Sequence, residues 1–125
     1  MSQGSRIGFA VFGLGRAGCI HATNLIRNPQ ASLRWIVDIE EDKAKEFVTA
    51  NFADTKVVTP SDMETVLRDP MVNAAVITTP THLHEEIVRC CLQAGKAVFC
   101  EKPVATTVEA IGDNFFVNSK QLRDM

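Results

Sequence analysis

The stretch AVFGLGRAGCIHA, residues 10–22, decides the fold, because its three glycines separate a strand-like segment from a helix-like one. Residues 6–12 are mostly apolar and are typical of a buried β-strand, whereas residues 16–27 have the pattern of a helix that ends before Asn28 and Pro29. Such a turn is either a structural joint or a place where free helix N–H groups hold a phosphate.

The rest of the chain repeats this alternation of strands and helices. Strands are expected at residues 33–38, 56–59, 73–78 and 96–100, and helices at residues 42–51, at about 63–67 and at 82–94. Repeated strand–helix units imply crossover connections and a parallel sheet covered on both faces. The sequence therefore predicts an α/β protein of the Rossmann type, with a doubly wound parallel sheet of about five strands in three α/β/α layers.

Three residues are predicted to mark the ends of helices. Ser61 and Thr81 are expected as the N-caps of the last two helices, and Gly95 as the residue that stops the last one. The apolar side of that last helix is expected to carry Leu83, Ile87, Cys90 or Cys91, and Ala94.

Composition limits the classes of function. A chain of 125 residues is enough for one domain, and its net charge of −2 argues against nucleic acid or an acidic membrane surface as a partner. No apolar stretch is long enough to span a bilayer, and the early run 7–14 lacks a signal-peptide cleavage site. The cysteines at positions 19, 90, 91 and 100 lack zinc-ligand spacing, so we expect no metal site and a cytoplasmic, reducing environment.

The glycine turn has the context that a dinucleotide-binding turn requires. Gly13 permits the tight turn, Gly15 lets the backbone approach a pyrophosphate, and Gly18 lets the helix pack closely on the strand. The start of the helix then offers free N–H groups and a positive dipole to the phosphates. The sequence favours this interpretation over a structural joint.

Asp38 ends the second predicted strand, 20 residues after Gly18. A carboxylate there either ends a strand as an ordinary polar residue or accepts hydrogen bonds from the adenosine ribose hydroxyls. Glu40 and Glu41 follow it, and the first cation is Lys43. A 2′-phosphate would meet these acidic side chains, so we expect NAD rather than NADP.

Four motifs together resemble the Gfo/Idh/MocA family of oxidoreductases, which includes inositol, glucose–fructose-type and dihydrodiol dehydrogenases. They are GLGRAG (13–18), VDI (37–39), ITTPTHLHEEIV (77–88) and GKAVFCEKP (95–103), and the resemblance covers about residues 6–110. It implies an NAD-dependent enzyme that transfers a hydride between NAD and the hydroxyl group of a polyol or sugar-like substrate.

The resemblance also implies roles for particular residues. Thr78, Thr79 and Pro80 would line the ribose and nicotinamide side, and His84 would be part of the site's architecture rather than its base. The sequence does not decide whether the side chain of Arg16 leans towards the pyrophosphate or lies in solvent. The expected cofactor-binding set is Gly13, Leu14, Gly15, Arg16, Ala17, Gly18, Asp38, Ile39, Thr78, Thr79, Pro80, His84, Glu101, Lys102 and Pro103.

Lys102 is the expected catalytic residue. The resemblance puts Glu101, Lys102 and Pro103 beside the nicotinamide, with a cis Lys102–Pro103 peptide. An ammonium group there can orient the reacting hydroxyl and stabilise negative charge as its proton leaves. Without the resemblance, a lysine that follows an edge strand is more simply a solvated side chain.

The resemblance ends near Ala110, and we divide the chain into a dinucleotide-binding domain, residues 1–110, and a divergent tail, residues 111–125, that is partly helical or disordered. The family's second, substrate-binding domain is absent from the sequence, so we expect a truncated form that meets a small polyol only if a second domain is supplied. The sequence leaves open whether the chain forms a homo-oligomer. The alternatives are an inactive NAD-binding or interaction module and, less favoured because of the EKP segment, a site for another nucleotide such as a methyl donor.

Overall fold

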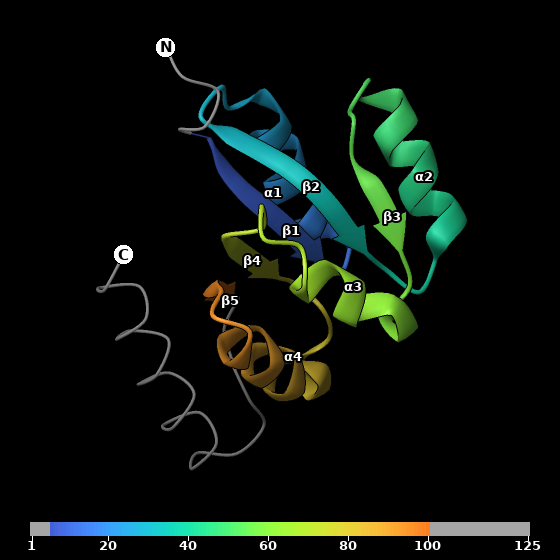
Figure 1. The fold of residues 1–125 in the computed structure, drawn as a ribbon. Coiled ribbons are helices and arrows are strands. Elements are labelled where there is room, and N and C mark those ends of the chain that lie inside the picture. The colour runs from blue at the N-terminus through green and yellow to red at the C-terminus, as the bar shows by residue number, and fades with distance from the viewer. Residues whose placement is uncertain (1–5, 101–125) are drawn as a thin grey trace.

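The computed structural model describes residues 6–100, apart from the side chain of Thr81 (Figure 1). The predictions for Glu101, Lys102, Pro103 and the tail lie outside the described residues. The strands are β1 (Ile7–Phe12), β2 (Ala31–Val37), β3 (Lys56–Val58), β4 (Ala74–Ile77) and β5 (Ala97–Cys100). The helices are α1 (Arg16–Arg27), α2 (Glu41–Ala50), the 3₁₀-helix η2 (Pro60–Asp62), α3 (Met63–Leu67) and α4 (Thr81–Gln93).

The strands form a parallel sheet in the order β3-β2-β1-β4-β5. From the central β1, the chain builds first to one side through β2 and β3 and then returns to pair β4 with β1 on the other side. The predicted doubly wound Rossmann fold is confirmed. Because the strand order reverses between β1 and β4, the carboxyl ends of these strands meet at the switch point where such sheets bind ligands.

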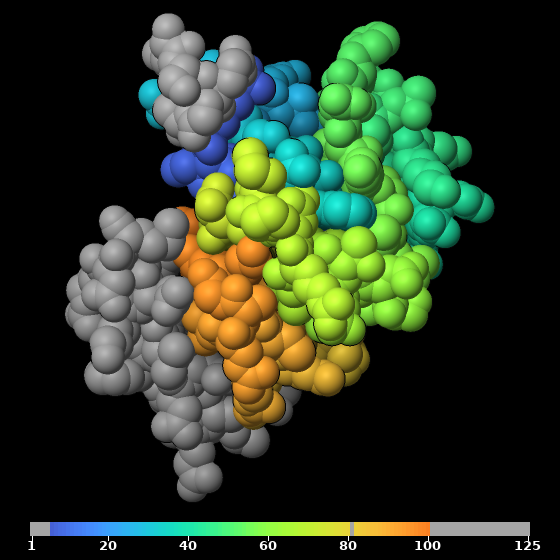
Figure 2. All heavy atoms as spheres, in the orientation of Figure 1, coloured from blue at the N-terminus to red at the C-terminus, as the bar shows by residue number. Residues whose placement is uncertain are grey.

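Alternating side chains of the strands create two cores, one on each face of the sheet. Val11 of β1 packs towards α1 and α2, with Ala22 and Ala44. Phe12 packs on the opposite face with Val66 of α3 and Val88 of α4. Figure 2 shows the atoms of α3 and α4 lying against each other over this second face. The sheet is therefore the middle of three layers.

The two predicted N-caps are wrong. Ser61 lies inside η2, where its hydroxyl is 2.8 Å from the hydroxyl of Thr59, and α3 begins at Met63 without a side-chain cap. Helix α4 begins at Thr81 itself, so Pro80 occupies the N-cap position. The prediction for Gly95 is confirmed, because it follows α4 with a φ of +80°, which glycine adopts without strain.

The buried side of α4 also differs from the expected one. His84, Val88 and Cys91 are buried, whereas Leu83 is 39% exposed. The apolar residues of α4 are compatible with two neighbouring stripes, one that begins at Leu83 and one that begins at His84. Treating His84 as a polar, exposed residue favours the stripe of Leu83, which is the wrong one. Burial raises the pKa of the Cys91 thiol to about 12, so it stays protonated inside the core.

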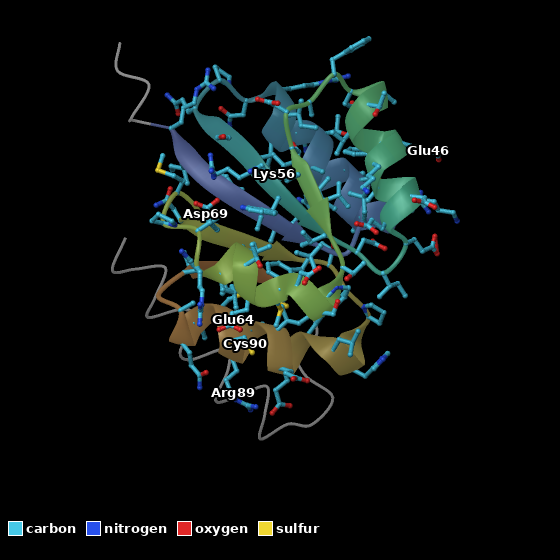
Figure 3. The ribbon with its side chains drawn as sticks, turned by 45° about the vertical axis from the view of Figure 1, so that its right-hand side comes forward. Glu46, Lys56, Glu64, Asp69, Arg89 and Cys90 are labelled. Atoms are coloured by element: carbon cyan, nitrogen blue, oxygen red, sulfur yellow. The ribbon has the colours of Figure 1, made fainter. Side chains whose placement is uncertain are left out.

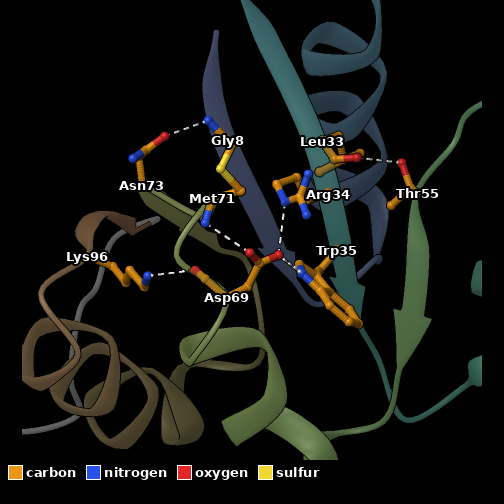
Figure 4. A network of polar contacts seen from close by, with 9 residues as sticks. All are labelled: Gly8, Leu33, Arg34, Trp35, Thr55, Asp69, Met71, Asn73 and Lys96. Atoms are coloured by element: carbon orange, nitrogen blue, oxygen red, sulfur yellow. Dashed lines mark hydrogen bonds and ion pairs between the residues drawn. The ribbon is translucent and has the colours of Figure 1, made fainter. Parts of the chain in front are cut away.

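A bulge in β2 brings two consecutive side chains to one carboxylate (Figure 4). The pairing of β2 with β1 shifts at Arg34. As a result the Nε of Arg34 and the Nε1 of Trp35 both donate to Oδ2 of Asp69, at 2.9 and 2.7 Å. Adjacent residues of a regular strand would face opposite sides of the sheet, so the bulge is what makes this double contact possible.

Asp69 ties together the segments that enter β4 and β5. Its Oδ1 accepts the N–H of Met71 at 2.9 Å, and its carbonyl oxygen accepts Nζ of the buried Lys96 at 3.0 Å. Burial alone would raise the pKa of Asp69, but the hydrogen bonds from Trp35, Met71 and Arg34 outweigh it and lower that pKa. The carboxylate is thus held in its charged form.

Candidate dinucleotide-binding site

The glycine turn leaves the carboxyl end of β1 with a backbone conformation that favours glycine. Gly13 has a φ of +91°, and its N–H donates to the carbonyl of Val37 at 2.8 Å. A Cβ at this position would also lie about 3.0 Å from the backbone of Thr79. The turn is therefore fixed against the ends of both β2 and β4.

Gly18 is the point of closest packing between α1 and the turn. A Cβ there would lie 2.0 Å from the carbonyl oxygen of Gly13 and 2.7 Å from Oγ1 of Thr78. That Thr78 hydroxyl donates to the same Gly13 carbonyl at 2.6 Å. The turn and the start of α1 thus meet the distant end of β4 without room for a methyl group at Gly18, as the spacing predicts.

Gly15 lies in the opposite kind of environment. A Cβ on Gly15 would meet no atom of the described chain within 4 Å. Gly15 occupies the N-cap position of α1 with no side-chain hydrogen bond, and no acidic residue lies in the first turn. The N–H groups at the start of α1, those of Arg16, Ala17 and Gly18, therefore have no side-chain cap and lie at the positive end of the helix dipole. The side chain of Arg16 is exposed.

Asp38 faces the glycine turn from the end of β2. Its Oδ2 accepts the N–H of Leu14 at 2.6 Å, and its Oδ1 accepts the N–H of Glu40 at 2.7 Å. Each carboxylate oxygen has two acceptor sites, so one on each oxygen stays available to a ligand. Ile39, in contrast, is 79% exposed.

A cavity of about 410 Å³ opens beside Asp38. It lies between the glycine turn and α2, and its lining includes Leu14, Gly15, Cys19, Asp38, Glu40, Lys43, Ala44 and Phe47. The contributions of Cys19 and of α2 were not predicted. A helix that directly follows the predicted acidic strand end is the signal that could have indicated α2, because it must pack back beside the turn.

The end of β4 supplies the third side of the site. The hydroxyl of Thr79 is buried and has no hydrogen-bond partner among the described residues. His84 is 2% exposed, and its Nε2 pairs with the carbonyl oxygen of Thr79. A carbonyl only accepts, so Nε2 carries the proton and His84 holds the loop from beneath. Pro80 joins this loop to α4.

The structure brings together the residues predicted from β1, β2 and β4. The glycine turn, Asp38 and the loop 78–80 meet at the carboxyl ends of the central strands, where a doubly wound sheet binds ligands. A second cavity, of about 450 Å³, lies at the other end of β2 and β3, near Arg6, Phe52 and Lys56. This second cavity lies at the amino ends of the strands, where such sheets do not bind ligands. The cavity beside Asp38 lies at their carboxyl ends and is therefore the candidate site. Among residues 6–100, no group of three metal-ligating side chains and no membrane-spanning helix is present.

The fold and this site define a nucleotide-binding domain of the Rossmann class. Residues 7–117 match the model of the Gfo/Idh/MocA family, described as an oxidoreductase family with an NAD-binding Rossmann fold. The chain belongs to this family, as its motifs predicted. The prediction of NAD as the family's cofactor is confirmed as well.

Several relatives of the chain are named as inositol dehydrogenases. It is 39% identical over 100 residues to myo-inositol 2-dehydrogenase of Thermotoga maritima, covering 80% of this chain and 28% of that protein. It is 41% identical over 64 residues to the NADP(+)-dependent scyllo-inositol 2-dehydrogenase of Bacillus subtilis, covering 51% of this chain and 17% of that one. The chain thus spans about 28% of the length of the Thermotoga relative.

Solved structures of such dehydrogenases have the same fold as this chain. Myo-inositol dehydrogenase from Lactobacillus casei, in complex with NAD(H) and myo-inositol, superposes with a TM-score of 0.80 at 28% identity. The match covers 92% of this chain and 34% of that one.

Proposed function

We propose that this chain is the NAD-binding part of an oxidoreductase that transfers a hydride between NAD and the hydroxyl-bearing carbon of a polyol of the inositol type. The observation that carries the proposal is the contact between Asp38 and the glycine turn, at 2.6 Å from Oδ2 to the Leu14 N–H. This contact places Asp38, which would accept hydrogen bonds from the ribose hydroxyls, beside the glycine turn, which would hold the phosphates, at the switch point of the sheet. The substrate class comes from the names of the relatives, and the domain division at about residue 110 stays a proposal.

The residues present fit a dinucleotide. The open space above Gly15 admits a pyrophosphate close to the backbone, and the first turn of α1 lacks a side-chain cap. The unpartnered hydroxyl of Thr79 is a buried polar group of the kind that a ligand satisfies. When bound, NAD accepts a hydride from a substrate carbon at its nicotinamide ring.

The chain's own residues would then bind and orient. The N–H groups of the first turn of α1 would hold the pyrophosphate, and the free acceptor sites of Asp38 would hold the adenosine ribose hydroxyls. Leu14 and Ile39 would flank these groups. Lys102, carried over from the family's EKP motif, would orient the substrate hydroxyl and stabilise negative charge as its proton leaves. Glu101 and Pro103 would position that lysine.

Cofactor binding is tested by titrating the full chain with NADH, using calorimetry or the fluorescence of the nicotinamide. We expect Asp38→Ala to weaken NADH binding roughly 10- to 100-fold, because hydrogen bonds to a charged acceptor contribute about 1.5–3 kcal/mol. Glu46→Ala is the matched control, since that carboxylate is exposed on the outer side of α2 (Figure 3).

Circular dichroism must show that each variant is folded, since Asp38 also accepts two backbone N–H groups. A folded wild-type chain that fails to bind NADH would overturn the proposal. So would an Asp38→Ala variant that is folded and binds NADH as tightly as Glu46→Ala does.

A further inference from the structure

Among the residues that the structure describes, three charged side chains line the cavity beside the glycine turn: Asp38, Glu40 and Lys43. They form a connected series. Oδ1 of Asp38 accepts the backbone N–H of Glu40 at 2.7 Å, and Oε2 of Glu40 lies 2.9 Å from Nζ of Lys43. The cavity that would receive the adenosine ribose therefore holds a cation already paired with an acid.

The position of Lys43 depends on this pair rather than on packing. Its side chain is 79% exposed, so no core contact holds it. The hydrogen bond and charge of Glu40 raise the pKa of Lys43, and the charges of Glu46 and Asp38 contribute in the same direction. The ammonium is thus charged and within the field of the Asp38 carboxylate.

NADP differs from NAD only by a phosphate on the 2′-hydroxyl of this ribose, the hydroxyl that Asp38 is proposed to hold. A cation would stabilise that phosphate, and Lys43 is the cation that the described part of the chain contributes to the lining of the cavity. Relatives of the chain include an enzyme named for NADP(+), so both cofactors occur among them.

We propose that Glu40 is a specificity-determining residue that favours NAD over NADP by pairing with Lys43 and so withholding that cation from a 2′-phosphate. The inference rests on the proposed binding of NAD at this site. Glu40 acts here through Lys43, in addition to any direct repulsion of the phosphate by its own charge. Substitution of its side chain leaves the contact with Asp38 in place, because that contact uses the backbone N–H.

The test is a double-mutant cycle on the full chain, with Glu40→Gln, Lys43→Gln and both together. For each variant, the dissociation constants of NADH and NADPH are measured by fluorescence titration. We expect Glu40→Gln to improve NADPH binding relative to NADH about fivefold, near the upper end for an exposed charge pair. In the Lys43→Gln background the same substitution should have less than half that effect on a logarithmic scale.

Glu41→Gln is the matched control. It removes one negative charge next to Glu40, at the first residue of α2, but Glu41 pairs with Lys45 at 3.6 Å and does not line the cavity. We expect it to leave the ratio of the two affinities unchanged.

Each outcome decides the question. An equal effect of Glu40→Gln with and without Lys43 would mean that Glu40 acts by its own charge alone, and would overturn the inference. An equal effect of Glu41→Gln, or a wild-type chain that binds both cofactors equally, would also overturn it. If Glu40→Gln binds NADH but leaves the ratio of NADPH to NADH affinity unchanged, this inference is wrong and the proposed function stands. If the folded chain binds neither cofactor, both are wrong.

Discussion

Gly15, at the N-cap of α1, and Gly18, in the first turn of that helix, lie three residues apart but serve different purposes. Gly18 has no room for a methyl group, because the carbonyl of Gly13 occupies it at 2.0 Å. A Cβ on Gly15 would meet no atom of the described chain within 4 Å, and its φ of −77° is one that any residue adopts. Gly15 leaves space for a ligand at the start of α1, whereas Gly18 allows α1 to pack against the turn.

Substitution by alanine should separate these two roles. We expect Gly18→Ala to lower the free energy of unfolding by about 3 kcal/mol, since backbone atoms must move. Gly15→Ala should change it by less than about 0.5 kcal/mol. It should nevertheless weaken NADH binding about tenfold or more, because the methyl group stands where the pyrophosphate approaches.

Urea unfolding and NADH titration of both variants check this prediction. Equal loss of stability in the two variants would contradict the distinct environments of the glycines. Unchanged NADH affinity in Gly15→Ala would contradict the place assigned to the pyrophosphate.

Single residues near the turn were predictable where the signal is local. The spacing of the three glycines and of Asp38 follows from the geometry of one strand–turn–helix unit and the next strand. Lys43 and Phe47 enter the cavity only because α2 packs back beside the turn. Their role depends on how two elements pack, which the spacing of residues along one element does not determine.

Helix α4 has a buried stripe that can be located by mutation. Val88 is fully buried on this stripe with His84 and Cys91, whereas Leu83, the residue before His84, lies off it at 39% exposure. We expect Val88→Ala to cost about 2 kcal/mol in the free energy of unfolding, and Leu83→Ala less than about 0.5 kcal/mol. Urea unfolding of the two variants measures both. A larger cost for Leu83→Ala would favour the stripe expected from the sequence.

Among the elements, strands and α-helices were predictable to within one or two residues, but the N-caps of α3 and α4 were not. Pro80 rather than a hydroxyl residue precedes α4, because the loop from β4 must turn at that point. The bulge at Arg34 was also beyond prediction, since an extra residue in β2 breaks the alternation by which strand faces are assigned.

For the domain as a unit, Asp69 links β2 to the segments that enter β4 and β5. The hydrogen bonds from Arg34, Trp35 and Met71 lower its pKa in the folded chain. The unfolded chain therefore binds a proton at higher pH than the folded one does. The stabilisation is fully present above the unfolded pKa of about 3.9, and it is lost as the pH falls through the lower folded value.

We therefore expect Asp69→Asn to lower the free energy of unfolding by about 1–3 kcal/mol at neutral pH, since it replaces a charged acceptor of three donors. The difference from wild type should shrink below about pH 4, where the carboxylate becomes protonated. Urea unfolding at a series of pH values measures both quantities. Glu64→Gln is the control, because its pair with Arg68 is more than 70% exposed on both sides. A difference that stays constant down to about pH 3 would contradict this account.

The architecture of the domain was predictable because strand–helix alternation leaves few topologies once crossovers are right-handed. The central position of β1 and the two cores follow from that rule. The contacts of Asp69 were not predictable, because they join β2 to a loop 34 and 35 residues further along the chain.

The hydrogen bond from Thr78 to Gly13 spans 65 positions, and it closes the glycine turn from the far side of the switch point. During synthesis, every element from α1 to β4 must therefore be translated before the turn can acquire this partner. Strand β1 emerges first but waits for β4 on its open edge. The glycine turn therefore acquires this partner only after residue 78 has been translated, although its glycines are among the first residues made.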